Sequence, residues 1–236
     1  KSRRVRATFD RIAAGYERAN RVISFGLDDW AKWRLGRRAE RAWPIGTEKG
    51  GRIVDVCAGP GGFARRLARR FPRAEVVAVD FSGPMLAAGA RRGGPSNLAW
   101  AGGDALALPL ADGACDLVTC VYGLRNLADL DRGLAEIVRV LRPGGALLAL
   151  DFQMPRNRRF GPIFRTYFEH VMPRLGEWAA GCPGSGAYAY LAASVRNWHD
   201  GDFLLESLGR AGLRAPWLEH WAAGTMVAFG GTKSDG

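Results

Sequence analysis

Residues 52–80 form the stretch that most constrains how this chain can fold. The stretch reads RIVDVCAGPGGFARRLARRFPRAEVVAVD: a short apolar run, a turn rich in glycine, an amphipathic run, and a second apolar run that ends in an acid. This order is typical of a strand, a tight turn, a helix and a parallel strand. We therefore predict an α/β protein whose sheet is built from units of this kind.

The turn and the terminal acid of this unit predict a cofactor that contains adenosine. Gly59 and Gly61 allow a ligand to approach the backbone, and the start of the following helix offers free N–H groups. Asp80 ends the second strand, where a carboxylate can accept hydrogen bonds from both hydroxyls of a ribose.

Two cofactors fit these features. Gly59, Gly61 and Ala64 also satisfy the G-x-G-x-x-A pattern of dinucleotide-binding proteins. Asp55, just before the turn, distinguishes the two cofactors, because its carboxylate would attract the ammonium of an amino acid and repel a pyrophosphate. This residue favours S-adenosylmethionine over NAD.

Length and composition indicate an ordinary globular protein with one domain. The 236 residues have a hydrophobic share of 47%, and no apolar run approaches the ~20 residues that span a bilayer. The cysteines show no C-x-x-C pairing, so we expect reduced thiols and a cytoplasmic location. His199 and His220 have no partner at metal-ligand spacing, so we expect no metal. The net charge of +11 leaves three interpretations open: a solvated surface, contact with an anionic membrane at its inner face, or nucleic acid. No RNA-binding aromatic motif supports the last, and we expect no nucleic acid.

Beyond Asp80 the alternation of strands and helices continues. Ser82 is predicted to cap a helix that carries Met85, and RPGG ends a helix over residues 130–141. Further strands are predicted at residues 98–101, 116–121 and 146–152. This alternation predicts a parallel sheet with helices on both faces.

Helical segments flank this core. Apolar residues at helical spacing predict a helix over residues 3–20 and a second helix to residue 41, with Asp28 as its candidate cap. Residues 160–178 are rich in aromatic and large apolar side chains, which form either plain core or a tunnel for a lipid tail that touches the membrane.

We therefore predict a single domain over residues 1–236. Its parts are an N-terminal helical cap, a cofactor-binding core, a helical substrate insertion, a C-terminal helix with two closing strands, and a disordered tail. In the same order, their bounds are residues 1–45, 50–152, 153–198, 199–231 and 232–236.

Several motifs resemble those of a known family. DVCAGPGG, VAVDFSGPML, GDALALP and RVLRPGG resemble the core of class I methyltransferases. YGLRN, with FDRIAAGYERANRVISFGLDDWAKW before it and YFEHVMPRLG and YAYLAASVRNW after it, resembles the ubiquinone/menaquinone biosynthesis C-methyltransferases. The resemblance covers about residues 8–230.

This resemblance implies a Rossmann-like, seven-stranded, mostly parallel sheet whose last strand is reversed, with an N-terminal helical cap and a helical insertion after strand five. It also implies that S-adenosylmethionine methylates a ring carbon of a polyprenylated quinol, converting demethylmenaquinol to menaquinol. A ubiquinone-pathway substrate and another phenol stay open, as do an NAD-dependent oxidoreductase and a non-catalytic binder. The implied partners are a lipid quinol with a prenyl tail and a membrane surface, and a homodimer stays open.

By position, the resemblance places cofactor contacts on Pro60, Asp80, the pair Asp104 and Ala105, and Val121. The pair follows the third strand, where its carboxylate and backbone N–H could bind the adenine edge. Pro60 and Val121 stand where Thr and Ser are commoner in the family, so side-chain hydrogen bonds are lost there. The whole predicted cofactor site comprises Asp55, Ala58, Gly59, Pro60, Gly61, Asp80, Phe81, Met85, Asp104, Ala105, Val121 and Tyr122.

Four residues are candidates for catalysis. Arg125 in YGLRN would stabilise a phenolate and lower the pKa of the quinol hydroxyl, or would pair with a surface acid such as Asp129. Asn126 would orient the ring oxygen or cap a helix. Tyr16 corresponds to a tyrosine that the family places over the cofactor, and its alternative is a packed aromatic. His170 would accept a proton or be a core residue.

Overall fold

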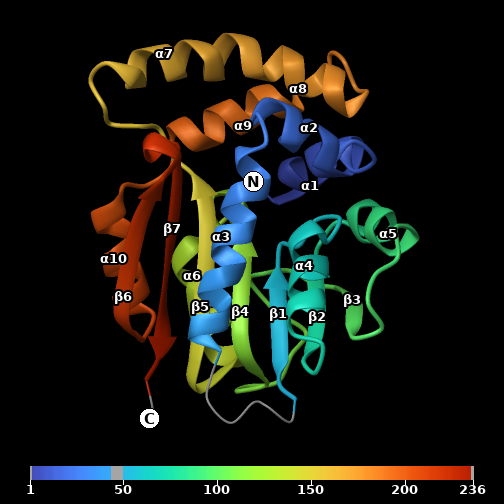
Figure 1. Ribbon diagram of the computed structural model, residues 1–236, viewed down its shortest axis with the longest axis vertical. Coiled ribbons are helices and arrows are strands. Elements are labelled where there is room, and N and C mark those ends of the chain that lie inside the picture. The colour runs from blue at the N-terminus through green and yellow to red at the C-terminus, as the bar shows by residue number, and fades with distance from the viewer. Residues whose placement is uncertain (1, 44–49, 235–236) are drawn as a thin grey trace.

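The computed structural model describes residues 2–43 and 50–234 (Figure 1). Within these residues seven strands form one sheet in the order β3-β2-β1-β4-β5-β7-β6. The first five strands are parallel, and β7 is antiparallel to both β5 and β6. The mostly parallel sheet with a reversed last strand is thus confirmed. The strands are β1 (Arg52–Val56), β2 (Glu75–Asp80), β3 (Leu98–Gly102), β4 (Cys115–Val121), β5 (Leu141–Phe152), β6 (Leu213–Trp221) and β7 (Met226–Lys233).

Apolar side chains alternate between the two faces of the sheet and build a core on each face. Ile53 of β1 packs with side chains of α3 and α4, whereas Val54 and Val56 pack with side chains of α6 and α10. In Figure 1, α3 and α4 lie in front of the sheet and α6 lies behind it. The helices are α1 (Ser2–Ile12), α2 (Tyr16–Ile23), α3 (Leu27–Ala42), α4 (Gly62–Arg70), α5 (Gly83–Arg91), α6 (Leu130–Val140), α7 (Phe160–Thr166), α8 (Met172–Ala180), α9 (Ala187–Arg196) and α10 (Gly201–Arg210).

A cap of helices lies across the carboxyl ends of the parallel strands. It consists of α1, α2, α7, α8 and α9, which come from the two ends of the predicted core (Figure 1). Gly15 lets α2 approach α8 closely, because a Cβ on Gly15 would lie 2.2 Å from the carbonyl oxygen of Ala180. The single helix predicted over residues 3–20 is wrong, since one helix ends at Ile12 and another begins at Tyr16.

Some other predicted boundaries also change. Ser82 is confirmed as the cap of α5, where its hydroxyl accepts a hydrogen bond from the Met85 N–H. The candidate cap Asp28 is wrong, because α3 begins at Leu27 and already includes Asp28. The residue before the helix is Gly26, which is left-handed with φ of 80°. The predicted helical insertion is confirmed as α7, α8 and α9, with a π-helical turn over Tyr167–Val171.

The C-terminal tail is shorter than predicted. Thr232 still belongs to β7, and so does Lys233, whose ammonium donates a hydrogen bond of 2.6 Å to the Leu141 carbonyl oxygen. The disordered tail predicted at residues 232–236 is therefore wrong in its first part, and residues 235–236 lie outside the described residues. Among the helices described, none combines the length and the apolar character needed to cross a membrane.

Candidate active site

The glycine-rich turn between β1 and α4 uses unusual backbone conformations. Cys57, Gly59 and Gly61 have φ values of 57°, 56° and 70°, in the left-handed region that favours glycine. Gly61 is also required for space, because a Cβ there would lie 2.2 Å from the Trp100 ring. Only glycine therefore fits this end of the turn without strain or displacement.

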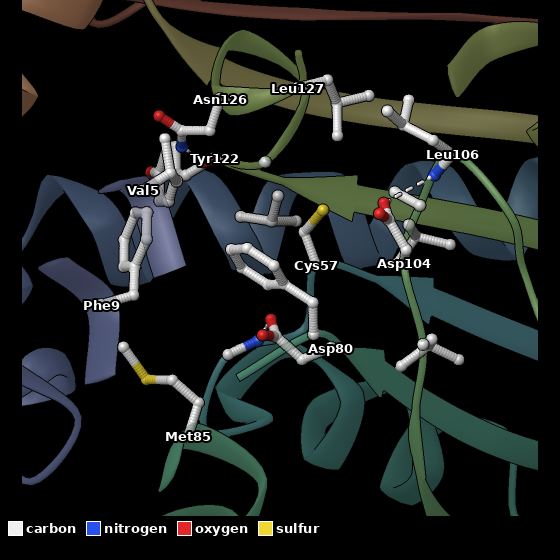
Figure 2. Close-up of a pocket in the computed structure, with 18 of the residues that line it drawn as sticks. Val5, Phe9, Cys57, Asp80, Met85, Asp104, Leu106, Tyr122, Asn126 and Leu127 are labelled. Carbon is white, nitrogen blue, oxygen red and sulfur yellow. Dashed lines mark hydrogen bonds between the residues drawn. The ribbon is translucent and has the colours of Figure 1, made fainter. Parts of the chain in front are cut away.

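Asp80 ties the turn to the end of β2. Its Oδ2 accepts a hydrogen bond from the Gly59 N–H and its Oδ1 accepts one from the Ser82 N–H, each at 2.8 Å. Burial raises the pKa of Asp80 above its ordinary value, although these N–H groups oppose the shift. The carboxylate also lines the cavity described next, where it can meet a ribose (Figure 2).

The main cavity opens at the carboxyl ends of β1, β2 and β4 (Figure 2). Asp104 stands on its wall and accepts a hydrogen bond of 2.9 Å from the Leu106 N–H, which leaves its other oxygen for a ligand. The cavity brings together most of the residues predicted to bind the cofactor or to act in catalysis: Tyr16, Gly59, Asp80, Phe81, Met85, Asp104, Ala105, Val121, Tyr122 and Asn126.

A smaller compartment adjoins this cavity, and we call it the turn compartment. The predicted residues Asp55, Ala58 and Pro60 line it, together with Lys32 of α3. Asp55 is 1% exposed and accepts a hydrogen bond of 2.7 Å from the Thr119 hydroxyl. Burial raises the pKa of Asp55 to about 7, against the opposing effects of that hydrogen bond and of Lys32.

Arg125 is buried and forms an ion pair with Asp151 at the end of β5. Both side chains are 1% exposed. The Arg125 guanidinium also donates hydrogen bonds to the Tyr122 carbonyl oxygen at 2.8 Å and to the Ser194 hydroxyl at 3.2 Å. Asp129, the acid considered from the sequence, instead caps α6. The cation predicted to activate the substrate is therefore held rigidly and partly neutralised.

Tyr16, at the start of α2 in the cap, and Asn126, after β4, both line the main cavity. Burial raises the pKa of the Tyr16 hydroxyl to about 12, so this hydroxyl stays protonated near neutral pH and can donate a hydrogen bond. The Asn126 side-chain amide donates to the Tyr122 carbonyl oxygen at 3.1 Å, and its oxygen accepts from the Tyr190 hydroxyl at 3.2 Å. Asn126 thus connects the end of β4 to α9.

The structure does not bring His170 to this cavity. The residue lies in the π-helical turn of the cap, where its side chain is exposed and its Nδ1 contacts the Thr166 carbonyl oxygen at 3.2 Å. It is therefore neither a packed core residue nor a neighbour of the cavity.

Two further compartments lie beneath the cap. The first shares walls with the main cavity, and the second shares walls with the first. The first, which we call the ring compartment, is a narrow space of about 10 Å³ lined by Phe9, Tyr16, Arg125, Phe152, Tyr188, Tyr190 and Leu191, among others. The second is an apolar cavity of about 580 Å³. Phe164, Tyr167 and Phe168 line it, so this part of residues 160–178 both packs against the core and surrounds a hollow space.

Sequence reasoning missed Lys32, Asp151 and Phe152 as site residues. Asp151 carried a usable signal, because LALDF places an acid at the end of a strand just as VAVD does at Asp80. Lys32 carried none, because its neighbourhood with Asp55 depends on how α3 packs on the sheet. No group of three or more His, Cys, Asp or Glu side chains suited to a metal occurs in residues 2–43 and 50–234.

Known proteins are similar to this chain over nearly its whole length. Residues 1–233 match the model of the ubiE/COQ5 methyltransferase family. A demethylmenaquinone methyltransferase of Deinococcus radiodurans is 40% identical over 91% of this chain and 86% of its own. One of Thermus thermophilus is 42% identical over 86% and 90%. The ubiquinone/menaquinone biosynthesis C-methyltransferase UbiE of Syntrophotalea carbinolica is 36% identical over 97% and 94%.

Solved structures share the fold at low sequence identity. A SAM-dependent methyltransferase of Thermotoga maritima superposes with a TM-score of 0.64 and 20% identity, over 97% of this chain and 99% of that one. Phosphoethanolamine N-methyltransferase 2 of Haemonchus contortus, in complex with S-adenosyl-L-methionine, gives a TM-score of 0.63 and 16% identity, over 86% and 53%. The arrangement of strands and helices is therefore that of the class I methyltransferases.

Cofactor affinity should rise with pH, because Asp55 must ionise to attract an ammonium. With a pKa of about 7, Asp55 is mostly neutral at pH 6 and mostly charged at pH 8. Lys32 and Asp80 are the other charged groups that influence it. We expect calorimetry to show affinity for S-adenosylhomocysteine rising by up to about tenfold between these pH values, and Asp55→Asn to remove the rise. A constant wild-type affinity would contradict this.

The same group should make the ligand-free protein less stable as pH rises. The folded-state pKa of Asp55 is raised above the ordinary value of 3.8, so the folded protein binds more protons than the unfolded chain between these values. The stability that the protonated group contributes is complete below about pH 4 and is lost as pH rises through about 7. Thermal unfolding of the wild type and of Asp55→Asn measures this contribution.

Proposed function

The chain belongs to the ubiE/COQ5 methyltransferase family, and we propose that it transfers a methyl group from S-adenosylmethionine to a ring carbon of a prenylated demethylmenaquinol. The observation that carries the proposal is the order of the compartments. The main cavity offers groups for adenosine, the ring compartment holds the buried cation Arg125, and the apolar cavity offers room for a hydrocarbon tail.

Shared walls support this order. The main cavity and the ring compartment share Phe9 and Tyr16, and the ring compartment and the apolar cavity share Phe152 and Leu191. The space beside Arg125 is about 10 Å³, so a quinol ring would bind there by displacing side chains that line it, with the cofactor on one side and the tail on the other. A small phenol without a tail would leave the apolar cavity unused.

The residues of the main cavity fit S-adenosylmethionine. Asp80 and Asp104 can accept hydrogen bonds from the ribose and the adenine, and Phe81 and Met85 provide apolar surface for the adenine ring. Asp55, in the adjoining turn compartment, can meet the ammonium. When bound, the cofactor supplies an electrophilic methyl group on a sulfonium.

The ring compartment supplies the groups that activate the quinol. Carbon methylation needs an electron-rich ring, and loss of the hydroxyl proton to solvent enriches the carbon ortho to the oxygen. Transfer of the methyl group to that carbon would release S-adenosylhomocysteine. The ring C–H proton would then leave to solvent while the oxygen regains a proton, which restores the aromatic quinol.

Arg125 stabilises the phenolate by charge and hydrogen bonding, while Asp151 fixes the orientation of the guanidinium. Tyr16, protonated at working pH, lines both the main cavity and the ring compartment and could donate a hydrogen bond to the quinol oxygen. Catalysis thus rests on positioning and electrostatics.

The apolar cavity supports a tail-binding role and contact with a membrane. Phe25 and Ile163 line it and are nevertheless 76% and 69% exposed, so its rim is an apolar surface. The segment that carries Ile163, residues 156–174, has five arginines and one acid, and Arg158, Arg159 and Arg165 are exposed. Exposed apolar side chains in a segment rich in arginine suit a bilayer with anionic headgroups. The protein would then take its quinol directly from the bilayer.

The proposed reaction predicts a methylated product and a dependence on the buried ion pair. Wild-type protein is given S-adenosylmethionine and demethylmenaquinol that has been prepared by chemical reduction of the quinone. It should yield S-adenosylhomocysteine and a quinol with a new ring methyl, identified by mass spectrometry and NMR. The double variant Arg125→Met/Asp151→Leu removes both charges together, so neither partner is left buried and unpaired. We expect it to lower kcat by about 100-fold or more while S-adenosylhomocysteine still binds.

Controls separate this effect from misfolding. Arg125→Ala alone leaves Asp151 uncompensated and should cost about 3–5 kcal/mol of folding stability, measured by urea unfolding. Arg37→Ala removes an arginine on α3 that is 56% exposed and should leave kcat unchanged. A double variant with the kcat of the wild type, or a wild type that methylates a tail-free phenol and not the prenylated quinol, would contradict the proposal.

The rim of the apolar cavity predicts how the protein binds vesicles. Wild-type protein should bind phosphatidylcholine vesicles containing phosphatidylglycerol more tightly than phosphatidylcholine alone. Phe25→Ser/Ile163→Ser should weaken this binding by about tenfold or more, since each large apolar side chain contributes ~1.5–3 kcal/mol when buried. Trp33→Ser, which removes an aromatic on α3 that is 52% exposed, is the matched control and should change little. Equal weakening in both variants would refute the assignment of this face.

A further inference from the structure

The turn compartment holds charged groups that the adenosine and quinol contacts do not use. It lies beside the main cavity, with which it shares Tyr16, Cys57, Gly59, Val121 and Tyr122 as walls. Three of its lining residues are charged, namely Glu17 of α2, Lys32 of α3 and Asp55 of β1. A ligand that enters it from the main cavity must therefore present charge of its own.

Lys32 is the cation of this compartment. Its ammonium donates a hydrogen bond of 2.8 Å to Asp28 Oδ2 and lies 5.6 Å from the centre of the Tyr122 ring. The Lys32 and Asp28 side chains are 12% and 5% exposed. An ammonium has three donors, and within residues 2–43 and 50–234 this bond to Asp28 is the one hydrogen bond that the Lys32 ammonium forms.

The carboxylates of Asp28 and Asp55 differ from that of Glu17 in how they are paired. Glu17 pairs with Arg65 at 2.7 Å and with Arg92 at 3.1 Å, so its charge is compensated on the outer side of the compartment. Asp28 is the hydrogen-bond partner of Lys32 and is not among the residues that line the compartment. Asp55 is buried, with the neutral Thr119 hydroxyl as its side-chain partner. The compartment thus offers a ligand one group of each sign, the Lys32 ammonium and the Asp55 carboxylate.

We propose that Lys32 binds the α-carboxylate of the cofactor's amino-acid end, opposite Asp55, which binds the ammonium. This assignment rests on the proposed function. The amino-acid end of S-adenosylmethionine is a zwitterion, and burying a zwitterion requires a partner of each sign. Asp80 and Asp104 are placed to bind adenosine in the main cavity, so the opposite end of the molecule lies toward the turn compartment. Without Lys32 this compartment would repel a carboxylate.

The alternative is that Lys32 only neutralises Asp28 and so supports the fold of α3. The two roles differ in which ligand they affect. S-adenosylhomocysteine carries the amino-acid end, whereas 5′-methylthioadenosine keeps the adenosine and the thioether but lacks that end. If Lys32 binds the carboxylate, replacing it lowers the affinity for the first ligand alone. If Lys32 only supports the fold, replacing it lowers the affinity for both ligands equally.

The test measures the affinity of both ligands by calorimetry for the wild type and for Lys32→Met. We expect Lys32→Met to lower the affinity for S-adenosylhomocysteine by about 10- to 100-fold, as for loss of a charge-assisted hydrogen bond. The affinity for 5′-methylthioadenosine should stay unchanged. Lys32→Arg should retain part of the selectivity, because it keeps the charge. Arg37→Met, on the exposed side of the same helix, is the matched control and should change neither affinity.

A companion variant protects the test against misfolding. Lys32→Met leaves Asp28 buried without its partner, so Lys32→Met/Asp28→Asn is measured beside it, and it should show the same selective loss. Equal weakening of the two ligands, or unchanged S-adenosylhomocysteine affinity, would overturn the role of Lys32 and leave the proposed function intact. If the wild type bound neither ligand, the proposed function would fail, and this assignment with it.

Discussion

The ion pair between Arg125 and Asp151 determines where the site can form. Two charges are removed from water at the carboxyl edge of the sheet, which is costly unless both are fully hydrogen-bonded. They are well supported: Arg125 also donates to the Tyr122 carbonyl oxygen, and Asp151 accepts from the Phe152 N–H at 2.9 Å. The pair thus joins the ends of β4 and β5. A ring stack between Tyr122 and Phe152, with centroids 4.3 Å apart, completes the junction.

The helical cap turns this junction into an enclosed site. The sheet alone supplies the cofactor turn and the buried pair, but the other walls come from α1, α2 and α9 (Figure 1). Tyr16 begins α2 and Tyr190 belongs to α9, so the N-terminal helices and the helical insertion after β5 meet above the sheet. Tyr190 is linked to the core through Asn126. The space beside Arg125 is therefore enclosed on sides that no single strand or helix provides.

The sequence predicted the sheet well because its signals are local. Glycines with positive φ, an acid at a strand end and alternating apolar runs each act within a few residues, so the turn and Asp80 could be placed without a structure. The partner of Arg125 could not be placed in this way, because Asp151 follows 26 residues later and meets Arg125 only through strand pairing. Lys32 and the apolar cavity likewise depend on how the cap helices pack.

The most direct test is the rate of methylation as a function of prenyl-tail length, at saturating S-adenosylmethionine in detergent micelles. If ring and tail occupy adjoining compartments, kcat/KM should rise with each added prenyl unit until the apolar cavity of about 580 Å³ is filled, and then level off. Phe164→Ala, which enlarges that cavity, should move the plateau to longer tails. A kcat/KM independent of tail length in the wild type would contradict the account.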